Sequence, residues 1–274
     1  MKKKRSVLEV LIEIFLWLLS LTILYPVAMV LITSFKSYGE ANFLNINLPK
    51  EWLFRNYLQV FEEGKILRSF LNSLVITILA VALIIILSSM LSFILARKRN
   101  RINKVIYFLL TLGIIAPFAA LPTIELLKVL GIYGSRISLV LVYSALFMPF
   151  STMLITSYIR TVPKELDEAA IIDGCKGFSM FFRIIFPLLQ PIIITVGVLN
   201  FMWVWNDFQY PLYLLNSSSK YTLPLSVYNF FGQYNRSWHL VCADMVLVTL
   251  PVIIIYLIAQ KYIVSGMTAG AVKG

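Results

Sequence analysis

Histidine, cysteine and charged side chains are scarce in this sequence. Its 274 residues include one histidine and two cysteines, and only 14% of them are charged. The zinc-peptidase motif His-Glu-x-x-His needs two histidines, so this chain cannot contain it, and no Gly-x-x-x-x-Gly-Lys-Ser/Thr phosphate-binding loop is present. His239 also lacks a nearby set of Cys, His or acidic residues. We therefore expect no catalytic residue, no bound metal and no cofactor in this chain.

Long apolar runs dominate the sequence instead. The chain is 59% hydrophobic and its mean hydropathy is +0.85, whereas a soluble domain is about a quarter charged. Backbone groups in lipid must be hydrogen bonded within the spanning structure, and the short alternating segments of a β-barrel are missing, so the runs are predicted to be helices. Each reaches the roughly 20 residues that cross a bilayer. The predicted spans are residues 7–32, 69–96, 105–130, 137–159, 191–215 and 241–264.

These runs predict an all-α, polytopic membrane protein with about six transmembrane helices in a single domain over residues 1–274. Pro26, Pro117, Pro122, Pro149 and Pro251 fall inside the predicted spans. A proline removes one backbone donor and tends to kink a helix, and broken helices often line a transport pathway. Proline is also simply more frequent in membrane helices than in soluble ones, so both interpretations stay open.

Basic residues predict the orientation in the membrane. The net charge is +11, and short basic segments lie at residues 2–5 and 97–104. Short loops rich in Lys and Arg stay in the cytoplasm, so both chain ends are predicted to be cytoplasmic in a multi-pass protein of the cell membrane. The basic excess thus indicates topology, and we expect no nucleic-acid partner. A cleaved signal peptide is the alternative for the N-terminus, but its apolar core spans only about 7–15 residues, so a retained helix is favoured.

The segment between the fourth and fifth spans does not resemble a simple linker. Residues 160–190 read RTVPKELDEAAIIDGCKGFSMFFRIIFPLLQ. Pro163 suits a first helical turn, and Glu165, Asp167 and Glu168 would lie where the helix dipole favours negative charge. The pair Asp173-Gly174 provides a stop, because glycine tolerates the positive φ that ends many helices. The segment is therefore predicted to carry its own short helix on the cytoplasmic side.

One face of this short helix is small and apolar. Leu166, Ala169 and Ala170 share it at spacings of three and four residues, and the other face carries charge. A short helix with one such face suits a groove on another protein. An interfacial helix resting on lipid headgroups is an equal alternative on physical grounds.

The same segment resembles a known signature. Glu168-Ala169-Ala170, then three residues to Gly174 and nine more to Ile184 and Pro187, is similar to the EAA motif of permease subunits of bacterial ATP-binding-cassette (ABC) importers. Phe186 stands where the family usually has leucine. Three further segments resemble the carbohydrate-importer branch of this family, of the maltose-permease second-subunit kind. They are residues 205–208, 222–225 and 260–274.

This resemblance implies the type I ABC importer permease fold with cytoplasmic coupling helices. It implies as partners a second permease subunit in a heterodimer, two ATP-binding subunits and an extracellular or periplasmic sugar-binding protein, besides the lipid bilayer. ATP would be hydrolysed by those subunits, docked on the EAA loop at 160–190, to move a sugar or oligosaccharide inward. The resemblance assigns ATPase coupling to Glu168, Ala169, Ala170 and Gly174. Leu166, from the shared helix face, and Asp173, from the predicted helix stop, complete the predicted coupling residues.

A second cluster is a candidate for the substrate path. Asp207 lies near the end of a predicted span among aromatic and amide side chains, and aromatic faces with a few polar groups suit a sugar ring. Aromatic belts at the membrane surface are the alternative. The cluster comprises Trp203, Trp205, Asn206, Asp207, Gln209 and Tyr210, of which Trp205, Asn206, Asp207 and Tyr210 are the predicted path residues.

Two other functions compete with an importer subunit. An ion-coupled secondary transporter would need embedded charges and commonly inverted repeats, but only Glu125, Asp207 and Asp244 qualify and no internal symmetry is visible. It would also leave residues 160–190 unexplained. A membrane enzyme would need clustered reactive side chains, which the sequence does not offer.

Overall fold

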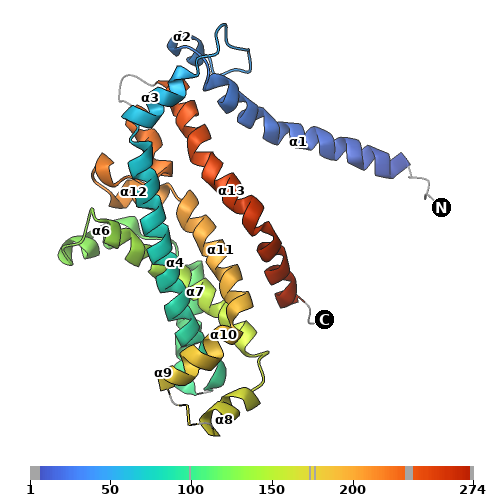
Figure 1. Ribbon diagram of the computed structural model, residues 1–274, viewed down its shortest axis with the longest axis vertical. Coiled ribbons are helices and arrows are strands. Elements are labelled where there is room, and N and C mark those ends of the chain that lie inside the picture. The colour runs from blue at the N-terminus through green and yellow to red at the C-terminus, as the bar shows by residue number, and fades with distance from the viewer. Residues whose placement is uncertain (1–6, 99, 173, 176, 232–236, 272–274) are drawn as a thin grey trace. The chain divides into compact units, whose positions relative to one another are not determined.

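The computed structural model is almost entirely helical over the residues it describes, which confirms the all-α prediction (Figure 1). It divides into two compact units, one of Met1–Leu67 with Ser226–Pro251 and one of Arg68–Leu225 with Val252–Gly274. The described residues are 7–98, 100–172, 174–175, 177–231 and 237–271.

Four of the described helices are long and apolar enough to cross a membrane singly, and the number rises to six if each of two bent pairs is one span. This agrees with the predicted count of about six. The single spans lie in α1 (Val7–Thr33), α4 (Ile66–Arg97), α7 (Arg136–Ile159) and α13 (Trp238–Ala271). The bent pairs are Arg101–Ile115 with Ala120–Val129, and Gly177–Leu188 with Gln190–Asn206.

The third predicted span, residues 105–130, is a bent pair of helices, broken near Pro117. Helix α5 (Arg101–Ile115) ends before Pro117, and α6 (Ala120–Val129) leaves at 117° to it. Proline cannot donate to the preceding turn, and its ring pushes the residue before it out of the helical region; Ala116 has ψ 127°. The turn from α6 into α7 is built on Gly131 and Gly134, both at positive φ.

The fifth predicted span, residues 191–215, is wrong in its second half. Helix α11 (Gln190–Asn206) ends at Asn206 because Asp207 is extended, with ψ 130°. The chain then makes the short helix α12 (Gln209–Leu214). Two short 3₁₀ turns follow in the next segment, η2 (Ser218–Lys220) and η3 (Pro224–Phe230).

In the larger unit, α7 packs against α5 and α11, and small polar side chains cross between helices (Figure 1). Asn200 donates to Ser151 Oγ at 2.9 Å, and Ser92 Oγ donates to the Thr152 carbonyl at 2.9 Å. In lipid, where apolar contact alone does not favour association of helices, close packing and such bonds hold a bundle together. A core of Ile76, Leu139, Tyr143, Val204 and Leu214 fills one end of this unit.

The smaller unit is organised by a buried asparagine. Helix α1 is followed by α2 (Tyr38–Ala41) and α3 (Arg55–Glu63). Asn56 of α3 donates to the Ser34 and Lys36 carbonyls at 2.8 and 2.9 Å. These carbonyls lie just past the end of α1, where no backbone N–H of the helix is available to donate to them. The Asn56 side-chain amide therefore joins α3 to α1.

The carboxylate of Glu40 closes the loop after α2. Its Oε2 accepts from Ser37 Oγ at 2.8 Å and Ser37 N at 3.1 Å, and its Oε1 accepts from Lys50 N at 3.2 Å. The Ser37 side chain first, and then the Ser37 and Lys50 backbone donors, lower the pKa of Glu40 because they favour the charged form.

A pH dependence of this loop follows. Because the pKa of Glu40 is lowered in the folded protein, its charged carboxylate stabilises the fold at pH values above the ordinary glutamate pKa. This stabilisation is lost as the pH falls through the lowered pKa of Glu40. We expect the protection of the Ser37 and Lys50 amides to fall roughly two- to fivefold over that acidic range, and Glu40→Gln to remove the dependence. Hydrogen exchange measured against pH checks this, and an unchanged profile in Glu40→Gln would contradict it.

Candidate functional site

The predicted cytoplasmic helix is α8 (Glu165–Ile172), and it ends as the sequence predicts at Gly174. Gly174 has φ +82°, its N–H donates to the Ile171 carbonyl at 3.0 Å, and Cys175 N donates to the Ala170 carbonyl at 2.9 Å. This pair of bonds is a Schellman motif, in which the residue after the helix adopts the left-handed conformation. Asp173, also predicted to act in coupling, lies outside the described residues.

The exposure of α8 differs from side to side. Asp167 is partly buried and Ala170 is buried, so these two residues face the rest of the chain. Leu166, Glu168 and Ala169 are exposed. The predicted apolar face is thus divided, since Ala170 packs inward while Leu166 and Ala169 remain outside. Ile172 is 85% exposed at the end of the helix, next to the turn.

The second half of the loop is anchored in the core of the larger unit. Helix α9 (Gly177–Met180), the π-helical turn η1 (Phe181–Ile185) and α10 (Phe186–Leu188) follow one another and bend by 79° into α11. Phe181 and Ile185 are buried in one cluster with Ala96 of α4 and with Ile155 and Ile159 of α7. The loop is therefore a folded part of the bundle, with α8 at its exposed end (Figure 1).

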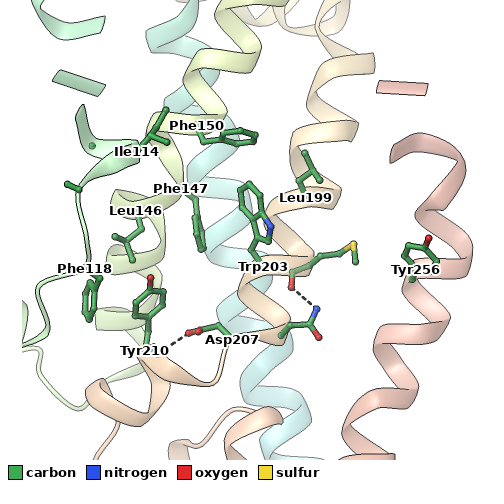
Figure 2. A pocket seen from close by; sticks show the side chains of 14 residues that line it. Ile114, Phe118, Leu146, Phe147, Phe150, Leu199, Trp203, Asp207, Tyr210 and Tyr256 are labelled. Carbon is green, nitrogen blue, oxygen red and sulfur yellow. Dashed lines mark hydrogen bonds between the residues drawn. The ribbon is translucent and has the colours of Figure 1, made fainter. Parts of the chain in front are cut away.

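A cavity of about 890 Å³ opens in the larger unit, bounded mainly by α7 and α11 (Figure 2). Its wall is aromatic. Trp203 lies between Phe147 and Phe150, with ring centroids 5.3 and 5.1 Å away. Polar groups gather at one end of the wall, where Asp207 and Tyr210 follow α11 (Figure 2). The lining includes Phe118, Phe147, Phe150, Trp203, Asn206, Asp207, Tyr210 and Tyr256.

Three of the four predicted path residues, Asn206, Asp207 and Tyr210, line this cavity, and Trp205 does not. Trp205 is 2% exposed, stacks on Phe201 at 5.3 Å and meets the edge of Phe70 at 5.6 Å. Helical geometry explains the difference, because residues three and four apart share a face. Counting back from Asn206 by three and four reaches Trp203 and Met202, which line the cavity, and this spacing was the available signal.

Asp207 organises the polar end of the cavity. Its Oδ2 accepts from the Tyr143 hydroxyl at 2.8 Å and from Tyr210 N at 3.1 Å, and its Oδ1 accepts from Gln209 N at 3.2 Å. The two backbone bonds satisfy donors that the first turn of α12 leaves free. One carboxylate thus starts α12 and orients Tyr143, whose ring meets that of Tyr210 edge-on at 5.9 Å.

Asp207→Ala should destabilise the protein by about 1–3 kcal/mol, because it leaves the buried Tyr143 hydroxyl unpaired. Asp207→Asn keeps an oxygen acceptor and should cost less. Thermal unfolding of the purified protein in detergent measures both. Tyr143→Phe is the matched control: combined with Asp207→Ala it should be less harmful than the sum of the two single changes. Strict additivity would contradict the bond.

Comparison with known proteins decides the family. Residues 62–269 match the family described as binding-protein-dependent transport system inner membrane component. The chain belongs to this family. It is therefore a membrane permease component of an ABC importer and not an enzyme, as the resemblance at residues 160–190 implied.

Individual relatives match nearly end to end. A probable starch degradation products transport system permease of Thermoanaerobacterium thermosulfurigenes is 35% identical over 93% of both chains. A melibiose/raffinose/stachyose import permease of Bacillus subtilis is 34% identical over 91% of both. A multiple sugar-binding transport system permease of Streptococcus mutans is 35% identical over 92% of both.

A solved structure has the same fold. A chain of a bacterial ABC transporter involved in the import of the acidic polysaccharide alginate superposes with a TM-score of 0.80 at 21% identity. The match covers 95% of this permease and 99% of that chain. At this identity the likeness establishes the fold alone.

Proposed function

We propose that this permease forms half of the membrane pathway of an ABC importer that carries a sugar or oligosaccharide inward. A second permease subunit forms the other half, and two ATP-binding subunits dock on the loop at 160–190. An extracellular or periplasmic sugar-binding protein delivers the substrate. Both chain ends lie in the cytoplasm. The relatives named for import of starch degradation products and of melibiose, raffinose and stachyose support the substrate class.

The observation that carries the coupling role is the exposed side of α8. Leu166, Ala169 and Ile172, spaced three residues apart, are all exposed, next to the exposed carboxylate of Glu168. An exposed apolar side next to a carboxylate fits a groove on another protein that encloses a short helix and places one basic residue opposite Glu168. The buried side holds α8 to the bundle through Asp167 and Ala170. Movement of the ATPase subunits therefore reaches the bundle through α8, whose end is set by Gly174. Asp173 remains a predicted coupling residue.

The cavity in Figure 2 is the place we assign to the substrate. Its volume of about 890 Å³ falls within the range of ligand pockets, and aromatic faces with a few polar groups bind the apolar faces and hydroxyls of sugars. Trp203 supplies the face, and Asn206, Asp207 and Tyr210 supply the polar end.

Purification of the complex tests the proposal. The chain should copurify with a second permease and an ATP-hydrolysing subunit, and candidate sugars with the cognate binding protein should stimulate ATP hydrolysis in proteoliposomes. One sugar should also accumulate inside. Transport by this chain alone without nucleotide, or labelling of α8 from outside the cell, would overturn the assignment.

A further inference from the structure

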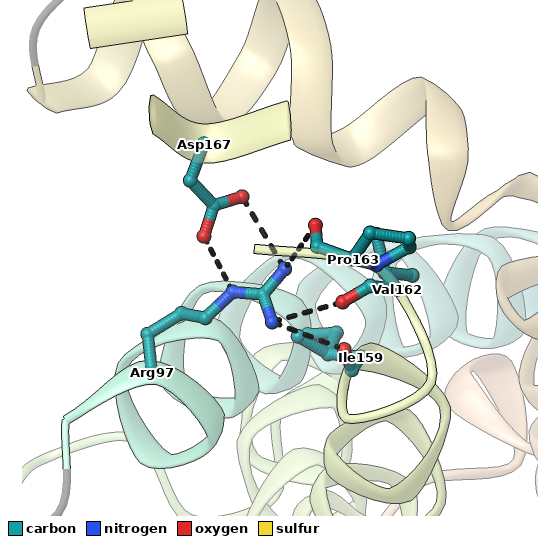
Figure 3. Close-up of polar contacts among 5 residues, drawn as sticks. All are labelled: Arg97, Ile159, Val162, Pro163 and Asp167. Carbon is teal, nitrogen blue, oxygen red and sulfur yellow. Dashed lines mark hydrogen bonds and ion pairs between the residues drawn. The ribbon is translucent and has the colours of Figure 1, made fainter. Parts of the chain in front are cut away.

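Arg97, the last residue of α4, connects three elements at the end of the bundle (Figure 3). Its Nη2 donates to Asp167 Oδ1 at 3.3 Å, and its Nε lies 2.5 Å from Asp167 Oδ2 as an ionic contact without hydrogen-bond geometry, so both carboxylate oxygens of α8 face the guanidinium. Its Nη1 donates to the Val162 and Ile159 carbonyls at 3.1 and 3.4 Å. Nη2 also lies 3.5 Å from the Pro163 carbonyl.

The chemistry of these acceptors requires arginine. Ile159 ends α7, and the last carbonyls of a helix have no partner within it and carry partial negative charge. A planar guanidinium can donate to a carboxylate on one edge and to carbonyls on another at fixed angles. A lysine ammonium is a point charge and cannot reproduce this arrangement.

The pair is largely withdrawn from water. The side chains of Arg97 and Asp167 are 12% and 13% exposed. Ala170 is buried on the same side of α8, one helical turn further on. A partly buried, two-point pair fixes orientation more reliably than it adds stability, because the loss of hydration offsets much of the attraction. The contacts therefore determine where α8 points relative to α4 and α7.

We propose that Arg97 and Asp167 are positioning residues that transmit the movement of α8 to α4 and α7 during transport. This inference rests on the proposed docking of the ATPase subunits on α8. The apolar cluster around Phe181 and Ile185 connects the loop to the same two helices behind α8. The ion pair between Arg97 and Asp167 connects α8 itself directly to α4. Helix α8 therefore moves together with the bundle and does not rotate independently about the turn at Gly174.

The experiment uses the whole importer complex in proteoliposomes and measures sugar transported per ATP hydrolysed. Arg97→Gln and Asp167→Asn should each lower this ratio at least about fivefold, while ATP hydrolysis continues. Arg97→Lys keeps the charge and loses the two-point geometry. Its ratio of sugar transported to ATP hydrolysed should lie between the ratios of these two variants and that of the wild type. The exchanged pair, Arg97→Asp with Asp167→Arg, should not recover the ratio, because a carboxylate at position 97 cannot donate to the Ile159 and Val162 carbonyls. Lys98→Gln removes an adjacent exposed charge and should have no effect.

The outcomes separate a positioning role from a structural one. An unchanged ratio in Arg97→Gln and Asp167→Asn would overturn the inference, and so would loss of the assembled complex in all the Arg97 and Asp167 variants, because that result indicates stability alone. Failure of the proposed function is distinct: the wild-type complex would then lack an ATPase subunit or would not transport at all.

Discussion

Replacing Gly174 with valine is expected to lower the sugar transported per ATP hydrolysed at least about tenfold. Gly174 has φ +82°, and this left-handed conformation costs a residue with a Cβ roughly 1–2 kcal/mol, with more for a β-branched side chain. A tenfold change corresponds to about 1.4 kcal/mol. Among the described residues, apart from the neighbours of Gly174 in the chain, no heavy atom lies within 4 Å of a Cβ built on Gly174, so the cost arises from the backbone and not from a clash.

The backbone origin of this cost predicts a graded series. Gly174→Asn should stay close to wild type because asparagine tolerates the left-handed region, and Gly174→Ala should lie between Asn and Val. Gly39→Val is the matched control. Gly39 lies in α2, is not among the positive-φ glycines of the described residues, and also has open space around a Cβ. Normal uptake in Gly174→Val would refute the role of this turn in coupling.

Replacing Trp203 with alanine is expected to lower uptake roughly five- to thirtyfold while the loaded binding protein still stimulates ATP hydrolysis. The indole forms the aromatic wall of the cavity with Phe147 and Phe150. Loss of one aromatic face from a substrate contact costs about 1–2 kcal/mol, which corresponds to that range. Stimulation should persist because α8 and its contacts are untouched.

Two variants sharpen this test. Trp203→Phe keeps an aromatic face and should retain most of the uptake. Trp17→Ala removes an exposed indole from α1, far along the sequence, and should change little. Uptake in Trp203→Ala at the level of Trp17→Ala would exclude Trp203 from the substrate path.

Local chemistry explains where sequence reasoning was correct. The helices over residues 7–33, 66–97, 136–159 and 238–271 follow from apolar length alone, because lipid leaves the backbone no other way to pair its groups. The end of α8 follows from Gly174 in the same way, since a left-handed residue after a helix needs no tertiary contact. Membership of the permease family was also readable from the spacing of Glu168, Ala169, Ala170 and Gly174.

Local chemistry also explains the break in the third predicted span. Pro117 was recognised as a possible kink inside the third predicted span, and the helix breaks there. The 117° bend depends on what lies beside the freed backbone groups as well as on the ring itself. The end of α11 at Asn206 is different, because the Asp207 carboxylate that follows it accepts not only from the nearby Gln209 and Tyr210 N–H groups but also from the Tyr143 hydroxyl, 64 positions earlier in the chain.

The sequence by itself determined that this chain is a bundle of membrane helices with a short helix in the loop between the fourth and fifth predicted spans, because apolar length and glycine act over a few residues. Only the tertiary structure decided which side of α8 faces outward, which face of α11 lines the cavity, and that Arg97 reaches Asp167. These facts depend on how each helix is rotated about its axis. That rotation is decided by contacts between residues dozens of positions apart, which no local pattern contains.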